Sequence, residues 1–382
     1  MGGSFQIGKL FGIPIKVHVL FLLLVAFYAF MGFSEGSKAG GFHVGLVQGL
    51  RSGLFIIALF GCVVVHELSH SLVARRYGVK VESITLLPIG GVSSMEEMPR
   101  KPSQELTMAI AGPLASIGVA GVFFVVSWAL NPAQPLPRFS PMGQHLVADL
   151  VRVNLLLAAF NILPAFPMDG GRVLRAVLAT HMSYVAATRI AAGVGQGVAV
   201  LMGVAGLILT GNFWLIIIAI FIFLGAGAEE RQVRIHALLE NVPVTQAMIP
   251  RFETMPPDYP LGYALQYASQ GYQHDFPIVD GGHIIGIVTR QGLIEGLSAQ
   301  SPQVPVRSVM RTDICQATPG ESLADVYVRL AKVGCPVALV VDQQRVVGLV
   351  TPDSVQAYLA AAVQRATYGG GGPSQTGSPD IV

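Results

Sequence analysis

Long apolar runs alternate with short polar segments from the N-terminus to Ala228. A helix needs about 20 apolar residues to cross the hydrocarbon core of a bilayer, and six stretches of the chain approach that length. They cover residues 17–33, 47–74, 106–130, 146–163, 186–209 and 213–228. The pattern therefore predicts a polytopic α-helical membrane protein with six transmembrane helices.

Between the second and third apolar runs the pattern changes from long runs to alternation. Residues 80–93 alternate apolar and polar positions and contain the pair Gly90-Gly91. Alternation with a period of two, together with turn-forming residues, is typical of a strand or hairpin. We expect a small β-hairpin insertion here, and an ordinary loop is the alternative.

From Val242 onward the chain repeats itself. Val242-Pro-Val recurs as Val304-Pro-Val, and five further residues have an identical counterpart at the same offset: Met248, Pro257, Leu261, Gly286 and Thr289. A fixed offset indicates two copies of one supersecondary unit. Each copy is predicted to contain an extended piece, a helix, two strands and a closing helix. The strands are expected at residues 276–280, 284–288, 338–342 and 346–350.

These patterns divide the chain into a membrane part and a soluble α/β part. The predicted segments are a transmembrane domain at 1–228, a linker at 229–241, a first module at 242–300, a second module at 301–362 and a tail at 363–382. The tail is rich in Gly, Ser and Pro from residue 369, so we expect it to be disordered.

Composition agrees with this division. Hydrophobic residues make up 52% of the 382 and charged residues only 12%, with a mean hydropathy of +0.59. Residues 1–228 hold 14 Lys/Arg and 8 Asp/Glu, whereas residues 229–382 hold 10 and 14. The net charge of +2 is too small to indicate a nucleic-acid partner.

The distribution of positive charge predicts the orientation. With the N-terminus inside, ten Lys/Arg of the membrane part fall in inner segments and four in outer loops, and cytoplasmic loops carry the excess of positive charge. Six spans then place both termini in the cytoplasm of a multi-pass cell-membrane protein. Cys315 and Cys335, which lie in the soluble part, are interpreted as reduced cytosolic thiols.

The second apolar run carries the motif His66-Glu67-Leu-Ser-His70. Residues four apart share one face of a helix, so His66 and His70 can hold one metal ion while Glu67 acts as general base on a water. An ionisable group at the centre of a membrane helix costs roughly 2.5–3.5 kcal/mol, so it needs a partner or a task. A bound metal would explain all three residues.

A candidate third ligand follows the fourth apolar run. The segment Asn161-Ile-Leu-Pro164-Ala-Phe-Pro167-Met-Asp169-Gly170 contains two prolines, which break a helix. Non-helical backbone at membrane depth is tolerated only where protein or a water-filled cavity covers it. A catalytic zinc usually has three protein ligands and one open position, and Asp169 completes that set. A helix-ending turn with a capping Asp is the alternative.

These two motifs resemble those of the site-2 protease family of intramembrane zinc metalloproteases. The second matches the family pattern Asn-x-x-Pro-x-Pro-x-x-Asp-Gly at Asn161, Pro164, Asp169 and Gly170, with the second proline one position later, at Pro167. Gly112-Pro113-Leu-Ala-Ser116 is similar to a further family feature. The resemblance covers roughly residues 5–228. It implies that His66, His70 and Asp169 bind one Zn²⁺ per chain, that Glu67 activates the water, and that Asn161 steadies the substrate or the developing oxyanion.

The repeated units from 242 to about 360 resemble tandem CBS modules. Within the family, a C-terminal pair resembles the subgroup that includes the sporulation pro-sigma-factor protease. CBS pairs often bind adenine nucleotides, with an Asp three residues after a Thr. This chain has Thr289-Arg-Gln-Gly292 and Thr351-Pro-Asp353-Ser354, so the first copy lacks the Asp and the second has it displaced by one position. Nucleotide binding and a role in homodimerisation or docking both stay open.

The resemblance implies a zinc-dependent intramembrane endopeptidase. Its substrate would be a transmembrane protein such as an anti-sigma factor, a pro-sigma factor or a similar membrane-tethered regulator, cleaved in or near its span within the lipid bilayer. Residues 82–94 could hold that substrate as an added strand. The alternative function is a membrane transporter or channel with a cytosolic CBS regulator, which would leave the joint occurrence of the two zinc motifs unexplained.

Overall fold

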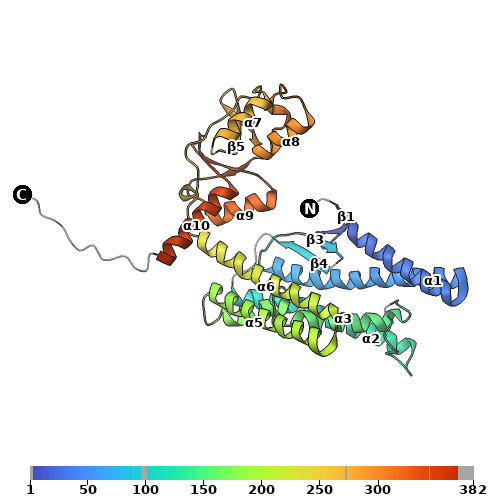
Figure 1. Ribbon diagram of the computed structural model, residues 1–382. Coiled ribbons are helices and arrows are strands. Elements are labelled where there is room, and N and C mark those ends of the chain that lie inside the picture. The colour runs from blue at the N-terminus through green and yellow to red at the C-terminus, as the bar shows by residue number, and fades with distance from the viewer. Residues whose placement is uncertain are drawn as a thin grey trace, which may run out of the picture. The chain divides into compact units, whose positions relative to one another are not determined.

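The computed structural model describes residues 3–88, 90–95, 101–140, 142–271, 273–343 and 345–368. The chain forms two compact units, Met1–Arg231 and Gln232–Val382 (Figure 1). Most of the segment predicted as a disordered tail, residues 369–382, lies outside the described residues.

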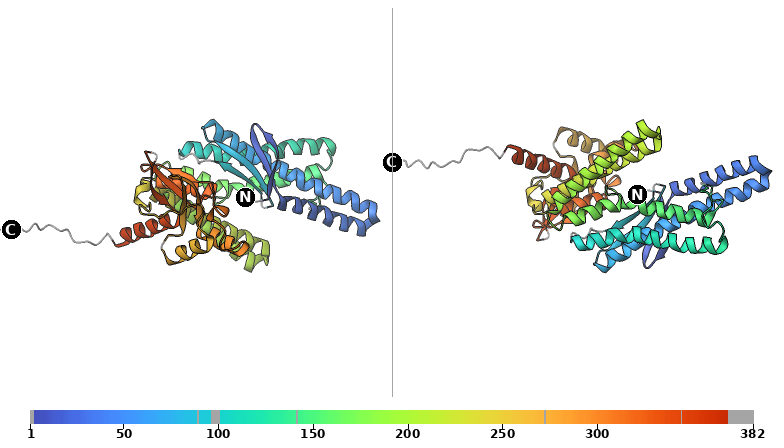
Figure 2. Two further views of the ribbon diagram at one scale, coloured as in Figure 1. Left: turned by 90° about the horizontal axis from the view of Figure 1, so that it is seen from above. Right: turned by 90° about the horizontal axis from the view of Figure 1, so that it is seen from below.

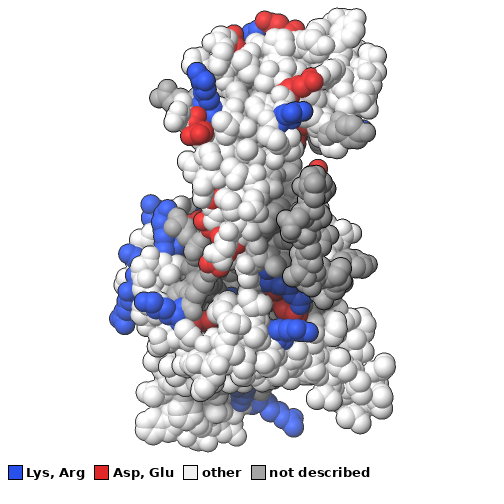
Figure 3. Space-filling view, turned by 90° about the vertical axis from the view of Figure 1, so that its left-hand side faces the viewer, with Lys and Arg blue, Asp and Glu red and all other residues white. Residues whose placement is uncertain are grey.

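Helices dominate the first unit. They are α1 (Val19–Arg76), α2 (Pro102–Leu130), α3 (Leu146–Ile162), α4 (Asp169–Leu178), α5 (Tyr184–Val204), which continues as the π-helical turn η1 (Ala205–Thr210), and α6 (Phe213–Leu239), whose residues after Arg231 belong to the second unit. Residues 229–239, assigned to a linker from the sequence, are therefore the last part of α6. On the side shown in Figure 3, wide areas of the surface carry no charged side chain.

Four helices among the described residues are long and apolar enough to span a membrane: α1, α2, α5 with η1, and α6. The predicted count of six is not confirmed. The first two apolar runs both fall in α1, which is broken by non-helical backbone at Gly40 and Gly41. The fourth run forms α3, which has only 17 residues.

The break in α1 makes a helical hairpin. Figures 1 and 2 show the first half of α1 running out to a tip and the second half returning beside it. The two halves pack closely, because a Cβ built on Gly36 would lie 2.8 Å from the Cα of Gly45. Small residues allow such close approach between membrane helices.

A four-stranded sheet lies beside the second half of α1. Its order is β1 (Ser4–Leu10), β2 (Ile13–His18), β3 (Val81–Leu87) and β4 (Gly90–Met95). The antiparallel pair β3–β4 is the predicted hairpin. The other two strands were missed, although Ile13, Ile15 and Val17 alternate with more exposed residues and pack into the core with α1. β2 runs parallel to β3 and joins the two hairpins.

The second unit contains the predicted repeat. Its elements are η2 (Val244–Gln246), α7 (Leu261–Gln270), β5 (Asp275–Asp280), β6 (His283–Thr289), α8 (Arg290–Ala299), η3 (Val306–Ser308), β7 (Cys315–Ala317), α9 (Leu323–Val333), β8 (Ala338–Asp342), β9 (Arg345–Val350) and α10 (Pro352–Tyr368). Leu261 and Leu323 begin corresponding helices, at the offset found in the sequence. The short strand β7 lies before α9, where the second copy was predicted to have an extended piece, and it pairs in parallel with β8.

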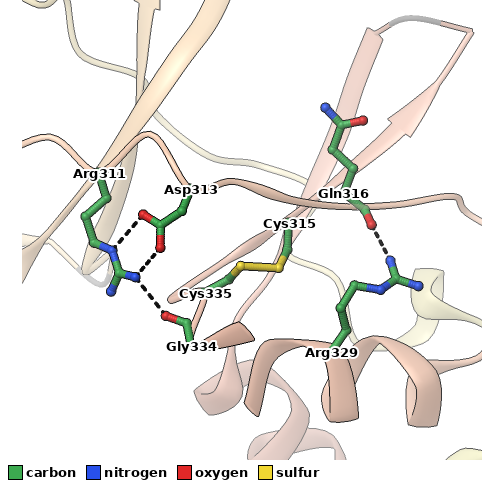
Figure 4. The surroundings of a disulfide bond; sticks show 7 residues. All are labelled: Arg311, Asp313, Cys315, Gln316, Arg329, Gly334 and Cys335. Carbon is green, nitrogen blue, oxygen red and sulfur yellow. Dashed lines mark hydrogen bonds and ion pairs between the residues drawn. A yellow bond between two sulfur atoms is a disulfide. The ribbon is translucent and has the colours of Figure 1, made fainter. Parts of the chain in front are cut away.

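The cysteines of the second unit differ from expectation. Cys315 and Cys335 form a disulfide with a Cα–Cα distance of 6.0 Å (Figure 4). The prediction of reduced thiols is therefore wrong for this structure. The residues are 20 positions apart, and they meet because β7 pairs with β8 just after Cys335. The cysteines therefore give no support to a cytoplasmic second unit, and that predicted orientation depends on the Lys/Arg distribution alone.

Candidate metal centre

The second half of α1 presents both motif histidines on one face. His66 and His70 are one helical turn apart, and their rings meet edge to face with centroids 4.9 Å apart. They are 3% and 5% exposed, and Asp169 is 7% exposed. Among the described residues, this is the group that could hold a metal ion, since one donor atom from each residue lies within 4.8 Å of the others.

The three donor atoms form a nearly equilateral triangle. His66 Nε2 and His70 Nε2 are 3.2 Å apart, and Asp169 Oδ2 lies 3.2 Å and 3.1 Å from them. Zinc bonds of about 2.0–2.1 Å in tetrahedral geometry separate ligand atoms by about 3.3 Å. The donor set and its spacing therefore fit a zinc ion with a fourth position left for water.

The position of Asp169 follows from the break after α3. That helix ends at Ile162, and the segment with Pro164 and Pro167 leads to Asp169 at the first position of α4. Phe166 and Met168 are buried on either side of Pro167 and anchor the segment. The predicted meeting of Asp169 with the two histidines, 103 and 99 residues away in the chain, is present in the structure.

Helix α2 orients both imidazoles from behind. His70 Nδ1 is 2.6 Å from the Met108 carbonyl oxygen, and His66 Nδ1 is 2.9 Å from Ser116 Oγ. A carbonyl only accepts, so His70 Nδ1 carries a proton, and in the neutral ring the lone pair is on Nε2, facing the triangle. Such outer partners fix the tautomer and orientation of metal-binding histidines.

Gly112 of α2 leaves the space that the cluster occupies. A Cβ at this position would lie 2.1 Å from His70 Nε2 and 2.6 Å from His66 Nε2. No side chain fits there unless the rings move. The segment Gly112-Pro113-Leu-Ala-Ser116 thus has two physical roles. Gly112 leaves room for the two imidazole rings, and Ser116 forms a hydrogen bond with His66.

We expect Gly112→Ala to lower the zinc affinity of the purified protein more than about tenfold, because the added methyl group displaces ligands whose outer contacts alone are worth 10–100-fold. The matched control is Gly118→Ala in the same helix, where a Cβ meets nothing within 4 Å. Zinc affinity is measured by competition with a chelator. Equal affinities of the two variants would contradict the assigned packing.

Glu67 is half-buried beside the cluster and contacts β4. Its Oε2 accepts a hydrogen bond of 2.8 Å from Ser93 Oγ. A Cβ on Gly91 would lie 2.7 Å from Glu67 Cγ, so this part of β4 passes directly over the glutamate side chain. Sequence reasoning missed both contacts, because they depend on how the hairpin packs against α1.

Asn161 is not joined to the cluster. It is half-buried, and its Nδ2 donates a hydrogen bond of 2.9 Å to the Leu157 carbonyl within α3. No hydrogen bond between described residues links it to the triangle. A role in steadying substrate therefore stays a prediction.

The predicted nucleotide positions of the second unit have local structural partners. Thr289 Oγ1 caps α8 by accepting from Gly292 N, and Thr351 Oγ1 accepts from Ser354 N. Burial raises the pKa of Asp275 to about 6; the nearby charge of His274 acts in the opposite direction, and that of Asp353 adds to the rise. Nucleotide binding stays a prediction.

The comparisons with known proteins agree with the two-part organisation. Residues 54–140 and 140–204 match the model of Peptidase family M50, and residues 244–299 and 306–361 match the CBS domain. The chain is 35% identical to a zinc metalloprotease of Methanocaldococcus jannaschii over 75% of this chain and 78% of that protein. It is 31% identical to Rip3 of Mycobacterium tuberculosis, named as a zinc metalloprotease, over 93% and 92%.

Among solved structures, the site-2 protease of Methanocaldococcus jannaschii is similar to this chain. The two are 39% identical, the match covers 59% of this chain and 95% of that one, and the TM-score is 0.41.

Proposed function

The chain belongs to Peptidase family M50, the family of zinc metalloproteases that includes the site-2 proteases, and on that premise we propose that it is a zinc-dependent intramembrane endopeptidase. Its reaction is hydrolysis of a peptide bond in or near a transmembrane segment of another protein. The observation that supports this most strongly is the convergence of His66 Nε2, His70 Nε2 and Asp169 Oδ2 on one point, in a structure where Glu67 follows His66 directly in α1.

The residues of the triangle would hold one zinc ion, which would activate a water molecule and polarise the scissile carbonyl. Glu67 would accept the proton of the attacking water and pass it to the departing amine. Ser93 Oγ donates a hydrogen bond to the Glu67 carboxylate and so fixes the position of the general base. The burial of all three ligands keeps bulk water away from them.

The topology we propose has six membrane crossings. The two halves of α1 would be the first two, α3 would contribute one, and α2, α5 with η1, and α6 would supply the others. The N-terminus and the second unit would face the cytoplasm, in line with the ten to four distribution of Lys and Arg. Because the histidine motif lies towards the inner end of its helix, water would enter from the cytoplasm.

We propose that the substrate binds as an extended strand along β4. Among the described strands, β4 is at the edge of the sheet, paired only with β3, and its Gly91 and Ser93 contact Glu67. A peptide bond inside an intact helix is shielded, so the substrate must unwind before cleavage. Strand addition gives the unwound backbone hydrogen-bond partners that the bilayer cannot supply.

Backbone N-methylation of the substrate tests this binding mode. An edge strand uses its outward N–H and C=O groups at every second residue. Single N-methyl groups along a peptide that covers the cleavage site should therefore reduce cleavage at least about tenfold at alternate positions. A loss independent of position would contradict strand addition.

The two CBS domains would regulate the protease or dock its substrate. The partner we propose is a membrane-tethered regulator of transcription, such as an anti-sigma factor or a pro-sigma factor.

The proposed function is tested by comparing membrane-protein fragments in cells that make the wild type or Glu67→Gln. Fragments that appear only with the wild type support the proposal and identify the substrate, whereas identical fragment patterns contradict it.

A further inference from the structure

Asp169 is the ligand that depends most on tertiary structure. The two histidines are fixed by one helix, but Asp169 begins the ten-residue helix α4 after a segment broken by prolines. The position of α4 relative to α1 must therefore be fixed by contacts elsewhere in the unit. A rigid side chain that contacts several elements of the site can provide them.

Arg175 of α4 meets that requirement. It lies six residues after Asp169, and it is 1% exposed although it carries a full charge. Its Nε donates a hydrogen bond of 2.7 Å to Glu105 Oε1, and its Nη1 donates one of 2.6 Å to Glu229 Oε1. Arg175 therefore joins α4 to α2 and to α6 at once.

The guanidinium is also held between two aromatic rings. Its Cζ lies 4.9 Å from the ring centroids of both Phe166 and Tyr184. Cations are attracted to aromatic faces at this range. Phe166 comes three residues before Asp169, so Arg175 contacts the chain on both sides of the ligand.

Each partner of Arg175 belongs to an element that shapes the site. Glu105 is completely buried in the first turn of α2, three residues before Met108, whose carbonyl orients His70. Glu229 lies one turn after Gly225 of α6, where a Cβ would come within 2.8 Å of Pro167 Cδ. The network thus connects the Asp169 segment to the helix behind the histidines and to the helix packed over the prolines.

We propose that Arg175 is a positioning residue of the metal centre, which fixes Asp169 by joining α4 to Glu105 of α2 and Glu229 of α6. This role rests on the metal centre proposed above. A buried ion network that serves only folding would have the same contacts, so the test must separate ligand geometry from stability. Lysine keeps the charge of Arg175 but offers no planar fork to two carboxylates, which makes Arg175→Lys the informative change.

The experiment uses the full-length protein purified in detergent, with zinc affinity measured by chelator competition and the melting temperature measured on the metal-free protein. We expect Arg175→Lys to lose about 10–100-fold in zinc affinity, as residues behind metal ligands typically do, with a melting temperature close to that of the wild type. Arg189→Lys is the control, because it makes the same change at an exposed position of α5. It should bind zinc like the wild type.

Unchanged zinc affinity of folded Arg175→Lys would overturn the proposal. Should that variant fail to fold, Glu229→Gln is read instead, because its side chain is 28% exposed and only one arm of the network is lost. A loss of zinc affinity in Glu229→Gln, smaller than that predicted for Arg175→Lys, supports the role, and wild-type affinity overturns it. Absence of zinc binding by the wild type would overturn the metal centre itself, which distinguishes the two failures.

Discussion

Glu67→Gln is expected to abolish peptide-bond hydrolysis while the purified protein keeps its zinc. The amide has nearly the same shape as the carboxylate and can still accept a hydrogen bond from Ser93 Oγ, but it cannot take a proton from water. General bases contribute about 10²–10⁴-fold to rate, so activity should fall at least about 100-fold. The measurements are the initial rate on the substrate identified in cells and the zinc content of the same sample.

The matched control for this change is Glu35→Gln. Glu35 is exposed on α1, the helix that also carries Glu67, so the variant makes the same chemical change away from the cluster. It should retain the wild-type rate. Full activity of Glu67→Gln would remove the base from the mechanism, and loss of its zinc would mean that Glu67 acts on the ligands instead.

Asp169→Ala should lose zinc. Asp169 supplies one of three donor atoms and the negative charge of the set, and its Oδ2 lies about equally far from both Nε2 atoms. Outer partners of ligands are worth 10–100-fold in affinity, so removal of a ligand should cost more than about 100-fold. Activity should disappear with the metal.

Chelator competition measures this loss, and Asp325→Ala, at an exposed position of α9, controls for the removal of a carboxylate. Addition of excess zinc should restore little of the activity, because the remaining pair of imidazoles holds the ion weakly. Tight zinc binding by Asp169→Ala would show that this carboxylate is not a ligand.

The three proposed ligands could be named from the sequence because each carries a local signal. The spacing of His66 and His70 is fixed by the helical repeat, and charged or ionisable groups in an apolar run need a partner. Asp169 was found from prolines and glycines that interrupt a span. Similar reasoning found the repeat of the second unit, since a constant offset between matching residues needs no knowledge of contacts.

What could not be predicted depends on packing between distant segments. The hydrogen bonds of His70 to Met108 and of His66 to Ser116 require the crossing of α1 and α2. β2 lies parallel to β3 although the whole of α1 separates them along the chain. No local sequence pattern therefore predicts that the two hairpins form one sheet. In the sequence, Arg175 was only one of the positive charges that predict the membrane orientation. Its burial between two carboxylates is seen only in the structure.

The number of membrane crossings could not be read from apolar length alone. Two runs are joined in α1 through Gly40 and Gly41, and a third forms a helix of 17 residues. The length of apolar runs gives the number of membrane crossings only when long polar segments separate the runs. Here the breaks are short, so counting runs and counting helices give different answers.

The central claim is that one zinc ion is held by His66, His70 and Asp169. The most direct test is a crystal of the zinc-loaded protein, examined by anomalous scattering at the zinc absorption edge. We predict one peak per chain, at about 2.0–2.2 Å from His66 Nε2, His70 Nε2 and a carboxylate oxygen of Asp169. A peak located elsewhere, or one bound by the histidines with Asp169 turned away, would contradict the account.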